Sequence, residues 1–165
     1  MDAALYELLV ARQNQMKTRL VKALIITLII VVAAIMIVFF PTFLPIVIIL
    51  GALAYFFVLP KFNVEYEYTL LQQDFDIDII YNKTSRKSAN TIDLREAELI
   101  APATSSRVAA FKTTAILDYS TQNPNDNPYA IIIPLNKNLT KILIQPDEGM
   151  IKLLRNVAPR VTFTD

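Results

Sequence analysis

Alternating carboxylates give this chain its clearest potential for chemistry. Glu65 and Glu67 alternate with apolar residues, and the run Asp74-x-Asp76-x-Asp78 repeats the alternation a few residues later. This period of two predicts two strands, and a hairpin register aligns their apolar residues on one face. The same register places Glu67 opposite Asp78. Like charges directly across a strand pair are destabilising, so we expect another group to neutralise them.

Two interpretations of that neutralisation remain open. In the first, the carboxylates bind a divalent cation. In the second, a third strand brings a basic side chain alongside, and this is the simpler one because carboxylates on a solvated face need no ion. The calcium-loop pattern also fails, since Ile79 stands where the loop requires glycine and Ser85 where it requires glutamate. We therefore predict no metal site. The basic candidates for the third strand are Arg95, Lys83 and Lys87.

Missing residue types restrict the possible chemistry further. The chain contains no cysteine and no histidine, which removes disulfides, thiol nucleophiles, nearly all zinc sites and the commonest general base. Glycine occurs only at Gly51 and Gly149, so no phosphate-binding loop or dinucleotide fingerprint can form. The net charge is +1, and residues 61–165 are nearly neutral, which argues against nucleic acid as a partner. We predict no enzymatic activity and no cofactor.

An apolar stretch without charged residues separates Lys22 from Lys61. A single helix through it would be about 55 Å long, whereas a hydrocarbon core is about 30 Å thick. Pro41-Thr42 breaks the stretch near its middle, which predicts a transmembrane hairpin over residues 23–60 with spans at 23–40 and 43–59. The segment before the first span is too long for a signal peptide. With no ionisable group inside the spans, we expect an anchor or a docking surface and no transport pathway.

Basic residues beside the spans predict the orientation. Lys17, Arg19 and Lys22 precede the first span and Lys61 follows the second, so both termini are expected in the cytoplasm of a cell-membrane protein. The apolar residues of the segment 1–22 recur at helical spacing, which predicts an amphipathic helix. That helix would lie on an anionic leaflet or extend the first span into the cytoplasm, and the sequence favours neither.

Residues 61–165 are predicted to form an α+β domain. The hairpin described above pairs Leu70 with Phe75 and Val64 with Tyr81. Further strands are expected near 91–95, 115–119, 129–135 and 140–145, with a polar turn over 82–88, an irregular stretch over 96–114 and an exposed loop over 122–128. A helix over 147–158 closes the domain. The fold class is thus a bent antiparallel barrel or sandwich of six or seven strands capped by one C-terminal helix.

The runs EYEYTL…FDIDIIYNKTSRKSANTIDLREAELIAP and QPDEGMIKLLRNVAP carry a resemblance to a known family. They are similar to an uncharacterised family of Firmicutes membrane proteins with two spans and a C-terminal bacterial pleckstrin-homology-like domain. The resemblance implies a PH-like fold and a tendency to form homo-oligomeric rings. It carries over no activity. Eukaryotic relatives bind inositol lipids through basic residues in the first hairpin turn, which we place at Gln72-Gln73-Asp74, a neutral to acidic turn.

Together these features predict a membrane-anchored cytoplasmic binding or scaffolding module. The alternative is an accessory subunit of a larger membrane complex, docked through its hairpin to a transporter or secretion system. The expected partners are the lipid bilayer and either a second copy or another membrane protein, met through an open sheet edge or the 122–128 loop. Basic turn residues either contact anionic lipid or balance nearby carboxylates. The candidate membrane-surface contacts are Arg12, Lys17, Arg19, Lys22, Lys61, Lys83, Arg86 and Lys87.

Overall fold

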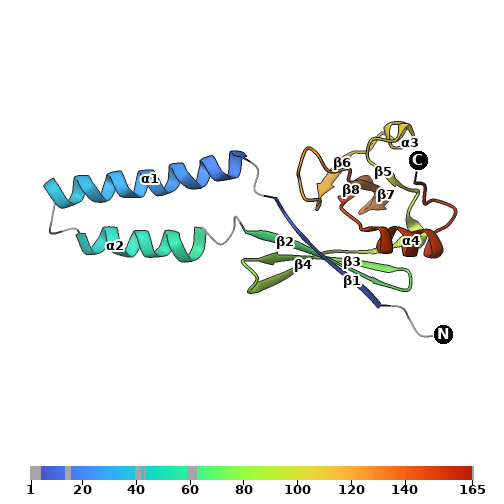
Figure 1. Cartoon of the computed structure of the whole chain (residues 1–165), viewed down its shortest axis with the longest axis horizontal. Helices are drawn as coiled ribbons and strands as arrows, with labels where there is room; N and C mark the ends of the chain where they lie inside the picture. Colours follow the sequence, from blue (N-terminus) through green and yellow to red (C-terminus); the bar gives the residue numbers. More distant parts are fainter. Residues whose placement is uncertain (1–4, 14–15, 40–41, 43, 59–62, 165) are drawn as a thin grey trace.

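A four-stranded antiparallel sheet is interrupted in sequence, after its first strand, by two apolar helices (Figure 1). The computed structural model describes residues 5–13, 16–39, 42, 44–58 and 63–164. The sheet has the order β1-β2-β3-β4. Its strands are β1 (Leu5–Ala11), β2 (Val64–Leu71), β3 (Asp74–Tyr81) and β4 (Ser85–Asp93).

The second sheet has the order β5-β7-β8-β6 and packs on the first to form a sandwich. Its strands are β5 (Leu99–Pro102), β6 (Ala115–Asp118), β7 (Tyr129–Leu135) and β8 (Asn138–Ile144). Short helices η4 (Leu94–Glu96) and α3 (Ser106–Ala109) lie in the connections, and α4 (Glu148–Val157) follows β8. The prediction of a PH-like sandwich with a C-terminal helix agrees with this arrangement. The predicted number of six or seven strands was too low, because the two four-stranded sheets of the described chain include β1 and β5, which were not expected.

Strand β1 corrects the predicted amphipathic helix over residues 1–22. Leu5–Ala11 pairs antiparallel with β2 along its whole length, from Leu5 opposite Leu71 to Ala11 opposite Glu65. Tyr6, Leu8 and Val10 turn toward the core because alternate residues of a strand share a face. Helical spacing and strand alternation overlap in so short an apolar run, and the pairing with β2 decides between them. The domain therefore begins before the apolar helices, at β1.

The hairpin of β2 and β3 has the predicted register at every position, including Glu67 opposite Asp78 and Tyr68 opposite Ile77. Three other details differ from the prediction. The polar turn is confined to residues 82–84, so β4 begins at Ser85. The stretch expected to be irregular contains β5, and β6 pairs with β8 in parallel. Both differences involve four-residue strands, whose partners lie far along the chain and leave little local signal.

The core lies between the two sheets, and α4 contributes to it. Met150 and Leu154 of α4 are fully buried against residues of both sheets. Asp147 caps the helix, with its Oδ1 accepting from the Met150 N–H at 2.8 Å. The Tyr6 hydroxyl donates to the other carboxylate oxygen at 2.6 Å, which ties β1 to α4. The largest fully buried side chains include Tyr68, Phe75, Ile77, Ile92, Ile131, Ile133, Ile142 and Ile144.

The helices α1 (Met16–Phe39) and α2 (Leu44–Leu53) lie side by side and extend away from the sandwich (Figure 1). A π-helical turn, η2 (Ala54–Val58), continues α2. Gly51 faces α1, since a Cβ built there would meet Ile29 at 4.0 Å. Among the described residues, one helix, Leu20–Phe39, is long and apolar enough to cross a bilayer, with a mean hydropathy of 3.0. The second, over Pro45–Phe56, is shorter.

Candidate membrane-proximal site

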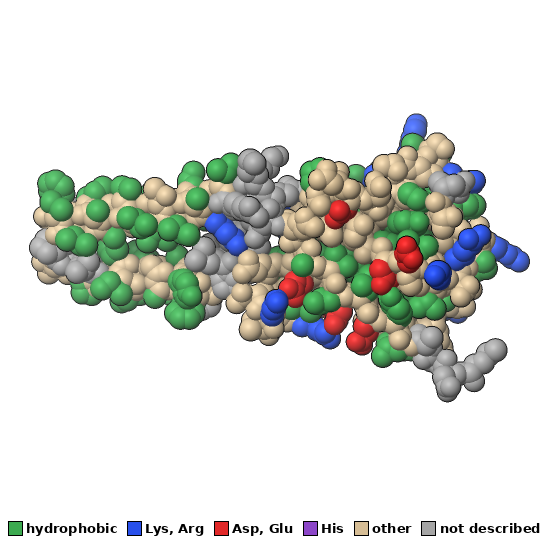
Figure 2. All heavy atoms as spheres, in the orientation of Figure 1, with side chains coloured by type: hydrophobic (Ala, Val, Ile, Leu, Met, Phe, Trp, Pro, Cys, Tyr) green, Lys and Arg blue, Asp and Glu red, His purple; other side chains and the backbone are tan. Residues whose placement is uncertain are grey.

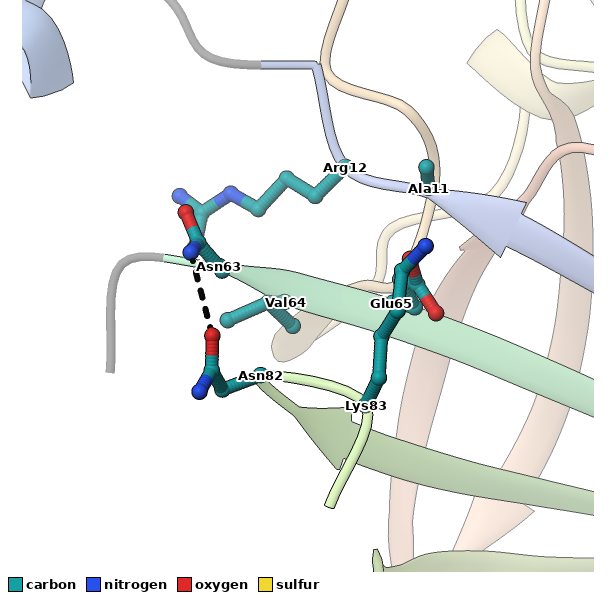
Figure 3. A pocket seen from close by; sticks show the side chains of 7 residues that line it. All are labelled: Ala11, Arg12, Asn63, Val64, Glu65, Asn82 and Lys83. Carbon is teal, nitrogen blue, oxygen red and sulfur yellow. Dashed lines mark hydrogen bonds and ion pairs between the residues drawn. The ribbon is translucent and has the colours of Figure 1, made fainter. Parts of the chain in front are cut away.

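The junction between the helices and the sandwich holds several of the polar residues singled out in the sequence (Figure 3). Arg12 follows β1, and its backbone N–H donates to the Val64 carbonyl at 3.0 Å, which extends the β1–β2 ladder by one position. The Gln13 N–H donates to the Thr121 carbonyl at 2.9 Å. The chain is thus hydrogen-bonded to the sandwich almost up to the point where α1 begins. We call this region the junction site.

A short hydrogen-bond relay links α1 to the sheet. Lys22 Nζ donates to Asn63 Oδ1 at 3.0 Å, and Asn63 Nδ2 donates to Asn82 Oδ1 at 3.3 Å. Asn82 lies in the β3–β4 turn with a positive φ of 49°. The relay therefore connects a residue of α1 to a turn two strands away, and it holds the first helix in place relative to the sheet.

Two adjoining hollows open at the junction site. The smaller has a volume of about 250 Å³, and the larger about 700 Å³. Arg12 and Val64 line both, and Figure 3 shows the Arg12 side chain reaching across toward Asn63. A guanidinium beside apolar and phenolic walls suits an anionic group carrying an apolar body. The larger hollow is lined by Arg12, Val64, Tyr66, Ile79, Tyr81 and Ser85.

Tyrosine side chains form the inner wall of this region. Tyr66 packs edge-on against Tyr119 with ring centroids 5.6 Å apart, and Asn90 Nδ2 donates to the Tyr119 hydroxyl at 2.6 Å. Burial raises the pKa of Tyr66, while the positive charge of Arg12 acts in the opposite direction. Burial also raises the pKa of Tyr119. Both phenols are therefore neutral hydrogen-bonding groups at physiological pH.

The carboxylates of β2 and β3 are neutralised by a third strand, as the simpler interpretation proposed. The residue that does so is Arg86 of β4, which contacts Glu67 directly and lies 3.8 Å from Asp78. Arg86 was not among the three candidates for the third strand, because the polar turn was expected to extend to residue 88. The turn ends at Thr84, so Arg86 lies on β4 opposite Ile80. The interpretation of the basic turn residues as balancing nearby carboxylates agrees with these contacts. No group of three potential ligands that could hold a metal ion occurs among the described residues.

The remaining basic candidates divide between the junction site and other locations. Lys83 lines the smaller hollow, and its Nζ lies 3.9 Å from Glu65 Oε1. Lys87 is opposite Ile79 in the register and so lies on the other face of the sheet from Arg86. Lys17 and Arg19 belong to α1, but their side chains lie outside the described part of the structure, as does Lys61. Arg95 pairs with its neighbour Asp93.

Sequence reasoning missed Asn63 and Asn82, the two amides of the relay. Asn82 was included in a polar turn, and asparagine is enriched at positive φ, so a local signal for its backbone existed. Asn63 comes close to Lys22 and Asn82 only because β1 and β2 pair across the inserted helices. No local sequence pattern indicates these contacts.

The connection between β6 and β7 is exposed at Pro124, Asn125 and Asn127, as expected of the 122–128 loop, but hydrogen bonds hold its start. Thr121 is buried, and its hydroxyl donates to Asp126 Oδ2 at 2.6 Å, while Asn123 Nδ2 donates to Asp126 Oδ1 at 3.1 Å. Together with the bond from Gln13, these contacts fix the start of the predicted 122–128 loop against the chain leading into α1.

Strand β1 also changes where the first hairpin of the fold lies. The first two paired strands are β1 and β2, and the chain from Arg12 to Asn63, with both apolar helices, connects them. The turn at Gln72-Gln73 is therefore the second connection of the sheet, and its neutral character says nothing about the first.

Comparison with known proteins agrees with the sandwich and its closing helix. No curated protein and no solved structure matches the chain. A family model, "Bacterial PH-like domain (DUF6106)", matches residues 2–164, which include β1 and the apolar helices as well as the sandwich. The chain therefore belongs to this family of bacterial PH-like domains.

Proposed function

We propose that this protein is a membrane-anchored binding module whose PH-like domain is held at the cytoplasmic face of the membrane by a helical hairpin. The observation that carries the proposal is the insertion of an uncovered apolar helix between two paired strands. None of Leu20–Phe39 is buried by the rest of the described chain. Figure 2 shows apolar side chains along both helices, whereas the charged side chains gather on the sandwich.

The pairing of β1 with β2 supports an anchor over a cleaved signal sequence. Cleavage after α1 would remove β1, which pairs with β2 over seven residues and places Val10 in the core. It would also remove the Tyr6 hydroxyl from Asp147. A segment whose loss disrupts one sheet edge and removes a hydrogen bond to the capping residue of α4 fits a permanent part of the protein.

The same pairing supports two membrane crossings. Strands β1 and β2 are neighbours in one sheet, so the chain must leave and return on the same side of the membrane. If α1 crosses the bilayer, the segment containing α2 and η2 must cross back. From Leu44 to Val58 this segment is about 22 Å long, which is less than the roughly 30 Å hydrocarbon core. Local thinning or association with other helices relieves such a mismatch.

The short second crossing also favours the alternative role. An accessory subunit could cover α2 and η2 with helices of a larger complex. Tyr55 and Phe56, which are 64 % and 69 % exposed, would then contact protein. In both roles the basic residues that flank the hairpin support a cytoplasmic location of the domain.

Single cysteines provide the test, because the natural chain contains none. Ser88→Cys places a thiol on exposed β4, and Thr42→Cys places one between the helices. We expect a membrane-impermeant maleimide to label Thr42→Cys in intact cells and Ser88→Cys only after permeabilisation. The chain should resist extraction from membranes by alkaline carbonate.

Labelling of Ser88→Cys in intact cells would refute the cytoplasmic orientation, and carbonate extraction would refute the anchor. Purification in mild detergent then separates the two roles. A constant larger partner in fixed stoichiometry supports the accessory subunit, and its absence supports the independent module.

A further inference from the structure

The open edges of the two sheets differ in how well they are protected from pairing with another chain. An exposed strand edge presents unpaired backbone groups, and proteins protect such edges with charged residues, bulges, proline, short strands or covering segments. Strand β4 carries Arg86 and Lys87 and has a register irregularity. Strand β5 is four residues long and ends in Pro102, and the chain near Val161 covers it through a bond from the Ile100 N–H. Strand β6 also has only four residues.

Apart from the single carboxylate of Glu7, strand β1 has none of these protections within the part of the chain that the structure describes. Its sequence, LYELLVA, contains one charged residue and no proline, and its seven residues pair with β2 without a bulge. Leu5 and Leu9 are 57 % and 55 % exposed, and Leu71, opposite Leu5 on β2, is 42 % exposed. A long, regular, apolar edge of this kind is a site for strand addition.

The ladder identifies the free backbone groups of this edge. Hydrogen-bonded and non-hydrogen-bonded pairs alternate in antiparallel strands, and Arg12 bonds to Val64. By this alternation Tyr6, Leu8 and Val10 direct their N–H and C=O groups toward β2. The remaining residues of β1 direct theirs outward, and no hydrogen bond to another described residue occupies these groups. They are Leu5, Glu7, Leu9 and Ala11.

The sheet face beside this edge is acidic. Glu7 lies opposite Thr69 on β2, and Asp76 of β3 follows in the same row. Neither carboxylate forms an ion pair with a described residue, whereas Glu67 and Asp78 share Arg86. An added strand would lay alternate side chains next to Leu5, Glu7 and Leu9. A strand in which basic residues alternate with apolar ones would place its basic side chains beside this acidic face.

We propose that the β1 edge binds the basic juxtamembrane segment of another membrane protein as an added strand. This inference rests on the proposed function, because it requires β1 to lie at the cytoplasmic face. Cytoplasmic segments next to membrane spans are rich in lysine and arginine. Such a segment would have the required positive charge and would lie as close to the membrane surface as β1. Strand β1 ends at Ala11 and α1 begins at Met16, so the edge lies within a few residues of the anchor.

A second copy of the chain is a poorer occupant of this edge. Its β1 would bring a further Glu7 and no cation to an acidic surface. Like charges across a strand pair are unfavourable. Self-association is therefore an alternative outcome of the experiment below.

The test uses the full chain in nanodiscs of neutral lipid and a fluorescent synthetic peptide of alternating lysine and valine, matched in length to β1. We expect binding measured by anisotropy to weaken as salt is raised. Two control peptides isolate its causes. Glutamate in place of lysine should abolish binding by removing charge complementarity, and alternate backbone N-methylation should weaken it by about tenfold or more by removing hydrogen-bond donors.

Matched variants locate the site. Leu9→Lys adds a protecting charge to the β1 edge and should weaken peptide binding by about tenfold. Ile116→Lys makes the same change on β6, where Ile116 is 59 % exposed, and should leave binding unchanged. Hydrogen exchange of the two variants checks that the sandwich stays folded.

Three results would overturn the proposal. They are equal binding of the N-methylated peptide, equal loss of binding in both variants, and a dimer of the chain that Leu9→Lys dissociates. If the peptide does not bind but Ser88→Cys stays unlabelled in intact cells, the proposed binding at the β1 edge is refuted and the proposed cytoplasmic orientation is not. Labelling of Ser88→Cys in intact cells refutes the cytoplasmic orientation independently.

Discussion

The two edge strands of the first sheet, β4 and β1, differ in how well they are protected from pairing with another strand. Strand β4 carries polar and basic side chains along most of its length and has an irregular register. Strand β1 is apolar and regular, and it carries a single carboxylate. The contrast teaches that exposure alone does not define a binding edge. What distinguishes β1 is the lack of the features that keep β4 from pairing further.

The two edges are also fixed differently to the core. Ile92 of β4 is buried between the sheets, and Arg86 binds carboxylates of the neighbouring strand β3 and of β2 beyond it. Strand β1 relies on Val10, on the Tyr6–Asp147 hydrogen bond and on its ladder with β2. It is therefore the edge whose attachment depends most on backbone hydrogen bonds.

The largest effect is expected from proline substitutions at adjacent positions of β1, which test its hydrogen bonds with β2. Leu8→Pro removes an N–H that faces β2 and leaves the Tyr68 carbonyl without its partner, at a cost of about 1–3 kcal/mol in the free energy of unfolding. Leu9→Pro removes an outward N–H and should cost clearly less. Urea unfolding in detergent, followed by tyrosine fluorescence, measures the difference. Equal destabilisation by both substitutions would contradict the assigned direction of the β1 backbone groups.

A smaller effect is expected from the protecting charge of β4. Arg86→Gln leaves Glu67 and Asp78 facing each other without a cation, which should cost roughly 0.5–1 kcal/mol because Arg86 is largely exposed. The cost should shrink as salt screens the two carboxylates. Lys87→Gln is the matched control, since Lys87 forms no ion pair among the described residues. A salt-independent loss of stability would show that packing of the Arg86 side chain matters more than its charge.

The smallest effect concerns the end of β4. Hydrogen bonds from Arg95 lower the pKa of Asp93 below its usual value. A lowered folded-state pKa contributes stability above the unfolded pKa, and this contribution is lost as the pH falls through the folded value. Arg95→Ala should therefore raise the pKa of Asp93, read from its carboxyl carbon shift by NMR, while Arg95→Lys should restore part of the shift. An unchanged pKa in Arg95→Ala would refute the assigned cause.

Elements set by local pattern could be predicted from the sequence. The β2–β3 register follows from aligned apolar residues across a two-residue turn, and Asp147 marks the start of α4. Strand β1 could not be predicted in this way. Its partner β2 follows two apolar helices, and its short apolar run fits a helix as well as a strand.

The junction site was predictable only in part. Arg12, Lys22 and Lys83 were expected near the membrane because of their charges, and the structure brings all three to the base of the helices. The amides of Asn63 and Asn82, which link Lys22 to the β3–β4 turn, carry no charge, and Asn63 reaches its partners only through non-local pairing. The turn before β4 is shorter than expected, and this explains why Arg86, and none of the three named candidates, meets both Glu67 and Asp78.

The insertion of both apolar helices between β1 and β2 has a consequence for how the protein is made. During synthesis β1 emerges first and must wait for β2, which follows the whole hairpin. If the hairpin inserted with a single crossing, the two strands would lie on opposite sides of the membrane and the sheet could not close. If the proposed anchor spans the membrane, the sheet closes only in chains whose hairpin has crossed twice, and wrongly inserted chains would remain unfolded and open to proteolysis.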